Sequence, residues 1–434
     1  MAVPMSALPT PIEHDQALPR MQARAAVGNV TFRTICNLAG LESVREVWNS
    51  WQKTRDSNFD FFCGVVRARG EACSPHVIVL LREGRPDALL VGFKERRRIP
   101  IRICSVAVLQ PELEVLEFVR GGLLGNNSEE NSRALVQTVM KSLANGAADL
   151  ALWDYLETES PLHHAALRSP NFVLRDHCRK LREHWFLDQP RGREMFFKNL
   201  ERSQRSKLRR KHKKFQEAFA GRIEVRSMQS VAELDDAVRN MEEIARKSVK
   251  RQLGFGFFDT PRHREQLLVE AALGWLRVFV LCVDGAPVSF WKGTLYERRL
   301  HADHVGFDSA WSEYSPGIFL FLEIIERLRD AEMDFMDFGT GTGQFYECFA
   351  KVRKPEARVQ IFAPKLRGIR LNLACTVAFH TTQLIQRTSW LDSARKALWK
   401  IRRSALEPTE PLTVKPETSE EVKAHDPLLE GDRR

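Results

Sequence analysis

The feature that most constrains the fold is a hairpin pattern that occurs twice, once in each half of the sequence. Residues 76–96 read HVIVLLREGRPDALLVGFKER and residues 278–298 read VFVLCVDGAPVSFWKGTLYER, each with two apolar or alternating runs around a Gly/Pro turn. Six residue pairs are identical at a constant offset of 201: Val77 and Val278, Val79 and Val280, Leu80 and Leu281, Gly84 and Gly285, Pro86 and Pro287, Gly92 and Gly293. This repeat predicts a duplicated domain, with convergence of two hairpins on turn residues as the alternative.

Each hairpin is followed by the pattern of a strand, a helix and a strand. This order predicts an α+β (mixed α/β) fold with two similar domains, each a mixed, mostly antiparallel sheet flanked by helices. The two ends of the chain lack a period and are rich in Pro and polar residues, which predicts disorder. The predicted segments are a disordered arm (1–40), an N-terminal domain (41–190), a C-terminal domain (191–364), a basic amphipathic helical extension (365–404) and a disordered tail (405–434).

Composition narrows the class of protein. The chain has 434 residues, 43% hydrophobic and 28% charged, which is ordinary for a soluble protein. No apolar run approaches the roughly 20 residues of a membrane span, and the N-terminus lacks the pattern of a signal peptide. Eight cysteines occur without a CxxC motif. They predict reduced thiols in a cytoplasmic protein, and neither a disulfide framework nor a metal site.

The net charge of +10 is concentrated in two segments, 191–214 and 365–403. The first forms a predicted helix over about 196–219, and its stretch Arg202–Lys214 is suited to an anionic partner such as nucleic acid, a carrier protein or a membrane surface. The alternative is a solvated helix face with Leu208, Phe215 and Phe219 pointing inward. Interleaved aromatic residues, typical of platforms for single-stranded nucleic acid, are missing.

The stretch 299–351 carries the best candidate for a ligand site. It predicts a strand, a break at Ser315-Pro316-Gly317, a helix from residue 318, a second strand ending near 338, the glycine run 339–343 and a last short helix. The N–H groups at a helix start are unsatisfied and carry partial positive charge, so they suit phosphate or a developing anion. Proline at N1 costs no hydrogen bond, Ser315 can cap, and Gly317 lets a phosphate approach.

The string DFGTG at 337–341 also resembles the first motif of Rossmann folds that bind nucleotides or a methyl donor. Such a motif opens a series of parallel strands, and here only roughly 90 residues follow, without that series. The pattern therefore favours a strand end that glycines open for close approach of a ligand, with a methyltransferase as the rival hypothesis.

The order of strands and helices from Arg222 to Pro364 resembles the GNAT acetyltransferase superfamily. The strings EYSPG (313–317), DFGTGTGQFY (337–346) and RSQRSKLRRKHKKF (202–215) resemble its CelD/BcsL-type branch, which is linked to cellulose or exopolysaccharide biosynthesis and related to the FemAB peptidyltransferases. The resemblance is good over about 196–364 and weaker over 41–190. It implies tandem GNAT-like domains, in keeping with the repeat.

The resemblance also implies a donor and its contacts. Acyl-CoA or acetyl-CoA would be the co-substrate, with no metal, and Tyr346 would be the general acid. In the branch, a lysine follows this tyrosine; here Glu347 stands in its place, and Lys351 one turn later could take over an anion contact. The expected donor contacts are Tyr314, Ser315, Pro316, Gly317, Gly339, Gly341, Gly343 and Lys351.

Acyl transfer also needs a base for the acceptor. Asp303 and His304 are candidates, and because they are adjacent on a strand, only one of them is expected to face the reacting atoms. Asp337 is a third candidate, or orients the glycine run.

The function predicted from the sequence is N- or O-acyl transfer to a sugar, an amine or an envelope or exopolysaccharide precursor. Two further alternatives are an aminoacyl-tRNA-dependent transferase of FemAB type and a non-catalytic protein that binds nucleic acid or a membrane surface. The oligomeric state is not predicted.

Overall fold

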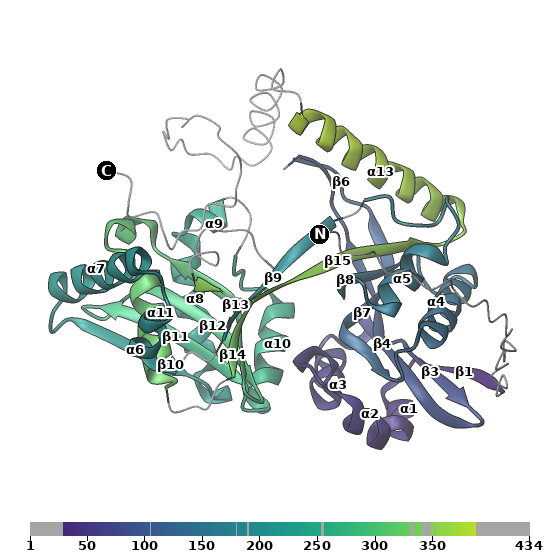
Figure 1. The fold of residues 1–434 in the computed structure, drawn as a ribbon, viewed down its shortest axis with the longest axis horizontal. Coiled ribbons are helices and arrows are strands. Elements are labelled where there is room, and N and C mark those ends of the chain that lie inside the picture. Colours follow the sequence, from purple (N-terminus) through teal and green to yellow (C-terminus); the bar gives the residue numbers. More distant parts are fainter. Residues whose placement is uncertain are drawn as a thin grey trace, which may run out of the picture.

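The computed structural model describes residues 29–104, 106–178, 180–188, 191–252, 256–329, 334–340, 349–350 and 352–387. Two lobes are visible, and the long strands β9 and β15 cross between them (Figure 1). Most of the predicted disordered arm, the whole predicted tail and the end of the helical extension lie outside these ranges.

The first half begins with short helices and contains the first copy of the hairpin. Its elements are β1 (Val30–Ile35), α1 (Leu38–Leu41), η1 (Glu42–Val44), α2 (Arg45–Trp51), η2 (Arg55–Ser57), α3 (Phe59–Ala68), η3 (Gly70–Ala72), β2 (Cys73–Pro75), β3 (Val77–Arg82), β4 (Arg85–Arg98), β5 (Ile101–Ile103), β6 (Val106–Leu109), β7 (Glu112–Gly125), α4 (Glu129–Ala144), β8 (Leu150–Glu157), α5 (Pro161–Arg168) and β9 (Lys180–Asp188).

The second half repeats this order and ends in a long helix. Its elements are α6 (Gly192–Lys198), α7 (Arg202–Ala218), β10 (Ile223–Met228), η4 (Val231–Glu233), α8 (Leu234–Arg246), α9 (Val249–Gln252), α10 (Pro261–Ala272), β11 (Leu276–Val283), β12 (Ala286–Tyr296), β13 (Arg299–Phe307), η5 (Ser309–Tyr314), α11 (Pro316–Arg327), β14 (Phe335–Thr340), β15 (Val352–Phe362) and α13 (Leu366–Arg387).

One mixed sheet runs through both halves. Within the described residues its order is β1-β3-β4-β7-β8-β15-β9-β14-β13-β12-β11-β10, with β2 beside β4. The pairs β7–β8 and β13–β14 are parallel, and the other neighbours are antiparallel. The predicted fold class, a mixed and mostly antiparallel sheet in each half, is confirmed.

The centre of the sheet is an exchange of strands between the halves. β15, from the second half, pairs with β8, whereas β9, from the first half, pairs with β14, and β9 and β15 pair with each other. Each half therefore completes the sheet of the other. The sequence pattern does not predict this exchange, and the domain boundary at 190 stays a prediction.

The offset of 201 recurs in the backbone. Glu83 and Gly84 have φ of 53° and 76°, and Asp284 and Gly285 have φ of 51° and 81°, so both hairpins use the same left-handed two-residue turn. The first strand pair of each hairpin also shifts register at matching places, between Leu80 and Leu81 and between Leu281 and Cys282. Equivalent turns and bulges support the duplication inferred from the six identities.

The second half has two packed faces. On one face Phe279, Leu281 and Trp291 are buried against α6, α7 and α11. On the other face Val278 and Val280, which alternate with those residues along β11, are buried against α8 and α10. The face toward α10 is the one that meets the first half.

Several local expectations differ from the structure. β1 lies inside the segment 1–40 that was predicted to be disordered, because its residues pair with β3. The predicted basic helix over 196–219 is broken into α6 and α7. The hydroxyl oxygens of Ser128 and Thr260 cap α4 and α10, since each accepts a hydrogen bond from the N–H of the third residue of its helix.

The helix α13 covers the small β5–β6 sheet at the edge of the first lobe (Figure 1). Its Leu371 and Ala378 are buried with Ile101. In the part of the chain that the structure describes, no helix is long and apolar enough to cross a membrane.

Candidate active site

The candidate site begins where two parallel strands part. β13 and β14 are paired only through three residues each, and the last pair is His301 with Asp337. Beyond this pair each strand continues without the other, β13 toward the start of α11 and β14 toward Gly339 and Thr340. Such a parting of parallel strands exposes backbone groups that a ligand can use.

The start of α11 carries an unusual turn. Ser315 has φ 52° and ψ 55°, and its side chain makes no capping hydrogen bond. The expectation that the Ser315 side chain caps the helix is therefore wrong. Its carbonyl oxygen accepts instead, from the N–H groups of Ile318 and Phe319. Pro316 occupies the first turn as predicted, and the first turn carries no acidic residue.

The equivalent helix of the first half, α4, starts differently. Ser128 accepts from the backbone N–H of Asn131, and Glu129 and Glu130 lie in the first turn. Two carboxylates at a helix start already complement its partial positive charge. Of the two helix starts, that of α11 has neither a side-chain cap nor an acidic residue in its first turn, although its Ile318 N–H donates to the carbonyl of Ser315.

The structure describes only some of the other residues predicted to contact the donor. Tyr314 lies against the ring of Phe219 at 4.9 Å, with the Lys214 ammonium 5.0 Å from its ring centre, so its ring packs on the end of α7. Gly339 has φ 68°, a conformation that favours glycine. Tyr346, Gly341, Gly343, Glu347 and Lys351 lie outside the described residues.

Asp303 belongs to a cluster of charges between the halves, which we name the lysine cluster. Asp303 Oδ2 accepts from Lys292 Nζ at 2.6 Å and from the hydroxyl of Thr294 at 2.8 Å, and Oδ1 accepts from Arg55 Nη1 at 2.8 Å. Lys292 also contacts Glu270 of α10 at 2.6 Å, and both are buried. Burial raises the pKa of Asp303, but the charges of Arg55 and Lys292 outweigh it and hold the pKa far below its usual range.

A bulge changes which strand residues share a face. The register between β12 and β13 shifts between Lys292 and Gly293, which gives β13 one extra residue there. As a result Asp303 meets Lys292 on the α10 side, and the ring of the adjacent His304 also lies 5.4 Å from His263 of α10. The prediction that only one of Asp303 and His304 can face a given side is wrong, because simple alternation does not hold across a bulge.

His304 lies among aromatic rings. Its ring is 5.7 Å from that of Phe257 and close to that of His263. Burial, with the positive charge of Lys292, lowers the pKa of His304 to about 4. His304 is therefore neutral at pH 7, and it is a weak base.

Asp337 is the centre of a second cluster, which we name the central cluster: Arg120, His184, His301, Asp337 and Glu356. Asp337 Oδ1 accepts from His184 Nε2 at 2.5 Å and from the backbone N–H of Gly339 at 2.7 Å. Burial raises the pKa of Asp337, but hydrogen bonds from His184 and His301 and the charge of Arg120 hold it well below its usual range. The bond to Gly339 fits the expectation that Asp337 orients the glycine run.

His184 is fully buried between two carboxylates. Its Nδ1 lies 2.9 Å from Glu356 Oε1, and its Nε2 faces Asp337. Burial lowers the pKa of His184, but the hydrogen bonds to Asp337 and Glu356 outweigh it, so its pKa is raised. Arg120, which contacts Glu356 at 2.7 Å, adds a positive charge beside the two carboxylates.

His301 is the residue that the sequence interpretation missed. Its Nδ1 lies 3.2 Å from Asp337 Oδ2, and its side chain is 15% exposed. The string RLHADHV did signal a polar strand, but the rule of alternation gave no reason to prefer His301 over His304. The other missed members of the two clusters, Arg55, Arg120 and His184, come from the first half, so no local pattern could associate them with β13 and β14.

The basic helix α7 is largely occupied by contacts within the chain. Leu208, Phe215 and Phe219 are buried as predicted, and so is Lys211. Arg209 contacts Glu194 at 2.8 Å and Lys214 contacts Glu313 at 2.9 Å. These ion pairs reduce the charge that α7 presents to an anionic partner.

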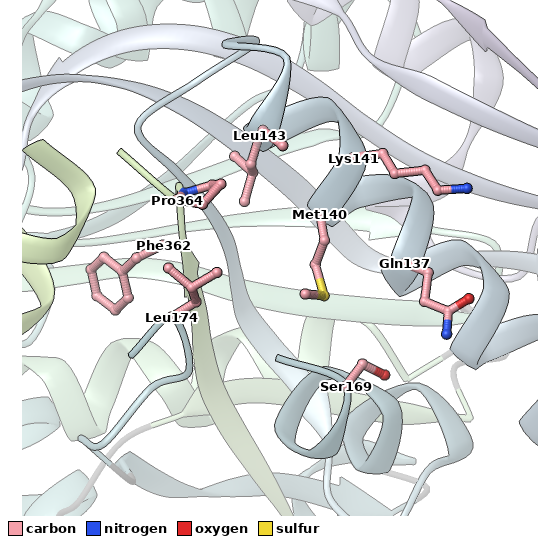
Figure 2. Close-up of a pocket in the computed structure, with 9 residues that line it drawn as sticks. Gln137, Met140, Lys141, Leu143, Ser169, Leu174, Phe362 and Pro364 are labelled. Carbon is pink, nitrogen blue, oxygen red and sulfur yellow. The ribbon is translucent and has the colours of Figure 1, made fainter. Parts of the chain in front are cut away.

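A cavity of about 410 Å³ lies between α4, the segment around Ser169 and Leu174, and the end of β15 (Figure 2), and no residue of either cluster is among those that line it. Met140 and Leu143 of α4 and Leu174 and Phe362 form its apolar wall. None of the predicted site residues lines it. In the described part of the chain, no group of His, Cys, Asp and Glu has the geometry of a metal site.

Comparison with known proteins places part of this chain in a family. Residues 202–347 match the sequence model of a family described as an acetyltransferase (GNAT) domain, about a third of the chain. This segment includes β13, the start of α11 and Asp337. No curated protein matches the sequence.

Solved structures resemble the fold at low identity. The C-terminal domain of a putative lysylphosphatidylglycerol synthetase from Agrobacterium fabrum is 12% identical, with a TM-score of 0.45, over 80% of this chain and 96% of that chain. FemX is 9% identical with a TM-score of 0.47, over 69% of this chain and 90% of that one. A tandem GNAT protein from the clavulanic acid biosynthesis pathway is 10% identical with a TM-score of 0.46, over 78% and 99%. Such distant likenesses say nothing of substrate. The family match is thus the similarity of residues 202–347 to a GNAT acetyltransferase domain.

Proposed function

We propose that this protein is an acyltransferase that takes an acyl group from acyl-CoA or acetyl-CoA and transfers it to an amine or hydroxyl. The observation that carries the proposal is the start of α11, inside the matched GNAT segment. There, the side chain of Ser315 makes no cap and no acidic residue competes for an anion, whereas the equivalent start of α4 has a side-chain cap and two acidic residues. A diphosphate would find its site at α11.

The reaction needs three groups besides the donor site. A base takes the proton of the acceptor, a donor of hydrogen bonds stabilises the oxyanion, and an acid protonates the leaving thiolate. We assign the acid to Tyr346, on the resemblance of the string DFGTGTGQFY. Backbone N–H groups where β13 and β14 part are suited to the oxyanion.

The acceptor we propose is a sugar amine or hydroxyl on an envelope or exopolysaccharide precursor, and the reaction would take place in the cytoplasm. The acceptor rests on the resemblance to the CelD/BcsL-type branch, not on the geometry. The compartment rests on the eight cysteines without a CxxC motif, which are typical of reduced thiols. An acyl-carrier protein or an aminoacyl-tRNA is the alternative donor, and it would use the exposed cations of α7.

Thermal unfolding with acetyl-CoA, longer acyl-CoAs and S-adenosylmethionine tests the donor. A ligand that binds only the folded state raises Tm in a concentration-dependent way, and at 100 times Kd the stabilisation is about 2.7 kcal/mol. We expect an acyl-CoA to raise Tm and Gly317→Glu to abolish the shift, because its carboxylate would occupy the anion site.

Gly317 is buried, so a second variant guards against simple misfolding. Ser315→Asp tolerates the left-handed backbone and places a carboxylate at a helix start, where it favours folding but repels phosphate. The matched control is Gln137→Glu on the exposed side of α4, which should leave the shift unchanged. An acyl-CoA shift that persists in both site variants, or a shift with S-adenosylmethionine alone, would refute the assignment.

A further inference from the structure

We propose that His301 is the general base of this acyl transfer and that Asp337 orients it. The inference deepens the proposed function and rests on it. His301 was not among the candidate bases considered from the sequence. The geometry of the central cluster favours it over those candidates.

The hydrogen bonds of Asp337 fix the tautomer of His301. Asp337 Oδ1 already accepts from His184 Nε2 and from Gly339 N, and Oδ2 lies 3.2 Å from His301 Nδ1. An ionised carboxylate only accepts hydrogen bonds, so Nδ1 of His301 must carry the hydrogen. The lone pair of the neutral ring is then at Nε2, the form that a base requires.

The Nε2 atom of His301 is buried and has no hydrogen-bond partner among the described residues. A buried polar atom without a partner costs free energy, and such atoms in folded proteins call for an explanation. An N–H or O–H of the acceptor would supply the missing donor. Its proton would then lie on the lone pair that removes it.

The position of His301 on its strand fits the shape of an acyl-CoA. His301 belongs to the last pair before β13 and β14 part, and α11 starts beyond the other end of β13. From His301 to Phe307 the strand spans about 20 Å, at about 3.3 Å per residue. Acyl-CoA carries its phosphates and its thioester at opposite ends of a long arm, so the two ends of β13 suit its two ends.

The other candidates are occupied or weak. Both oxygens of Asp303 accept from cations or a hydroxyl in the lysine cluster. Asp337 uses both oxygens within the central cluster. His304, with its pKa lowered to about 4, is a poor acceptor of protons near pH 7.

The proposed acyl transfer moves one acyl group and two protons. The acceptor nitrogen or oxygen forms a bond to the acyl carbon while its proton passes to His301 Nε2. The carbon–sulfur bond then breaks, and the CoA thiolate takes a proton from the general acid of the proposed mechanism. The products are the acylated acceptor and free CoA. His301 returns its proton to the solvent, and the general acid takes one proton back from it, so both groups regain their starting state.

The first test is the release of free thiol from acetyl-CoA with a panel of primary amines as acceptors. The variant is His301→Asn, whose amide can still donate to Asp337 but has no base at the Nε2 position. We expect kcat to fall by about 10²–10⁴-fold while KM for acetyl-CoA changes less than about twofold. His263→Asn, a matched histidine of α10 on the same face, should keep wild-type kcat within about threefold. A His301→Asn enzyme that keeps a third or more of wild-type kcat would overturn the inference.

A second readout does not depend on finding an acceptor. In protein labelled with ¹⁵N-histidine, the signals of His301 are those missing from the His301→Asn variant. A protonated Nδ1 with an unprotonated Nε2 supports the dyad, and a protonated Nε2 overturns it. If the wild-type protein neither binds nor consumes acetyl-CoA, the proposed function fails, and the spectrum still decides whether Asp337 sets the tautomer.

Discussion

At the scale of single residues, two buried histidines should respond to pH with opposite sign. The pKa of His184 is raised in the folded state by Asp337 and Glu356, whereas burial, with the charge of Lys94, lowers the pKa of His76 to about 4. In the unfolded chain the pKa of a histidine is about 6.5. His184 therefore stabilises the fold fully below that pH and loses its contribution as pH rises through its raised pKa. His76 opposes folding as pH falls from 6.5 toward 4, by up to about 3 kcal/mol.

Urea unfolding at several pH values checks this prediction. Relative to wild type, His184→Gln should be most destabilised at or below about pH 6.5, and the difference should shrink in alkaline solution. His76→Leu removes a group that must stay neutral, so its stability relative to wild type should rise as pH falls. Free energies of unfolding that run parallel to wild type at all pH values would contradict the assigned shifts.

The same residues mark how far a sequence can predict a site. Asp337 and Ser315 were found because each lies in a local motif. His301 was missed because it is one of several polar residues on its strand, and the local pattern does not show that it contacts Asp337. Arg120 and His184 were missed because they reach Asp337 from the other half, a contact that no local period encodes.

At the scale of elements, the start of α11 combines strain with a ligand site. A serine with φ 52° is in the left-handed region, which costs a non-glycine residue of order 1 kcal/mol, and its side chain returns no capping bond. Ser315→Gly should therefore raise the free energy of unfolding by about 1 kcal/mol. If the hydroxyl serves the donor phosphates, the same change should weaken the Tm shift with acetyl-CoA.

If Ser315→Gly raises stability and also weakens the Tm shift with acetyl-CoA, the strained backbone at Ser315 serves ligand binding. If it raises stability alone, the strain has no role in binding the donor. The measurements are urea unfolding without ligand and thermal unfolding with acetyl-CoA. Ser128→Gly, at the equivalent start of α4, is the control. It removes a real capping bond and should not gain stability. A Ser315→Gly protein that is less stable than wild type would mean that the side chain stabilises the turn.

Most elements were predictable, because strand and helix periods and capping residues are local signals. The two hairpins, α11 and β14 lie where the sequence predicts them within a few residues. β1 was missed, since an edge strand with exposed polar residues resembles an unstructured arm. The partners of β9 and β15 were not predictable, because an exchanged strand has the same pattern as one that pairs within its own half.

At the scale of the whole molecule, the exchange makes the two halves depend on each other. β15 lies between β8 and β9, and β9 lies between β15 and β14 (Figure 1). Unfolding either half would remove a strand from the middle of the sheet and leave the backbone groups of its neighbours unpaired. The interface between the halves adds ion pairs from Arg55 to Asp303 and from Arg262 to Glu95.

The chain should therefore unfold in one cooperative transition, although its sequence is that of two domains. In scanning calorimetry we expect a single peak with equal calorimetric and van't Hoff enthalpies.

The variant Arg55→Met removes the ion pair between Arg55 and Asp303 but keeps the exchanged strands β9 and β15. Asp303 then has one cation fewer beside it. The variant should lower stability by about 3 kcal/mol and keep one peak, because loss of one partner of a buried pair is costly but the strands still join the halves. Two resolved peaks in wild type would mean that the exchanged strands do not couple the halves. Two peaks in Arg55→Met alone would assign the coupling to the lysine cluster instead.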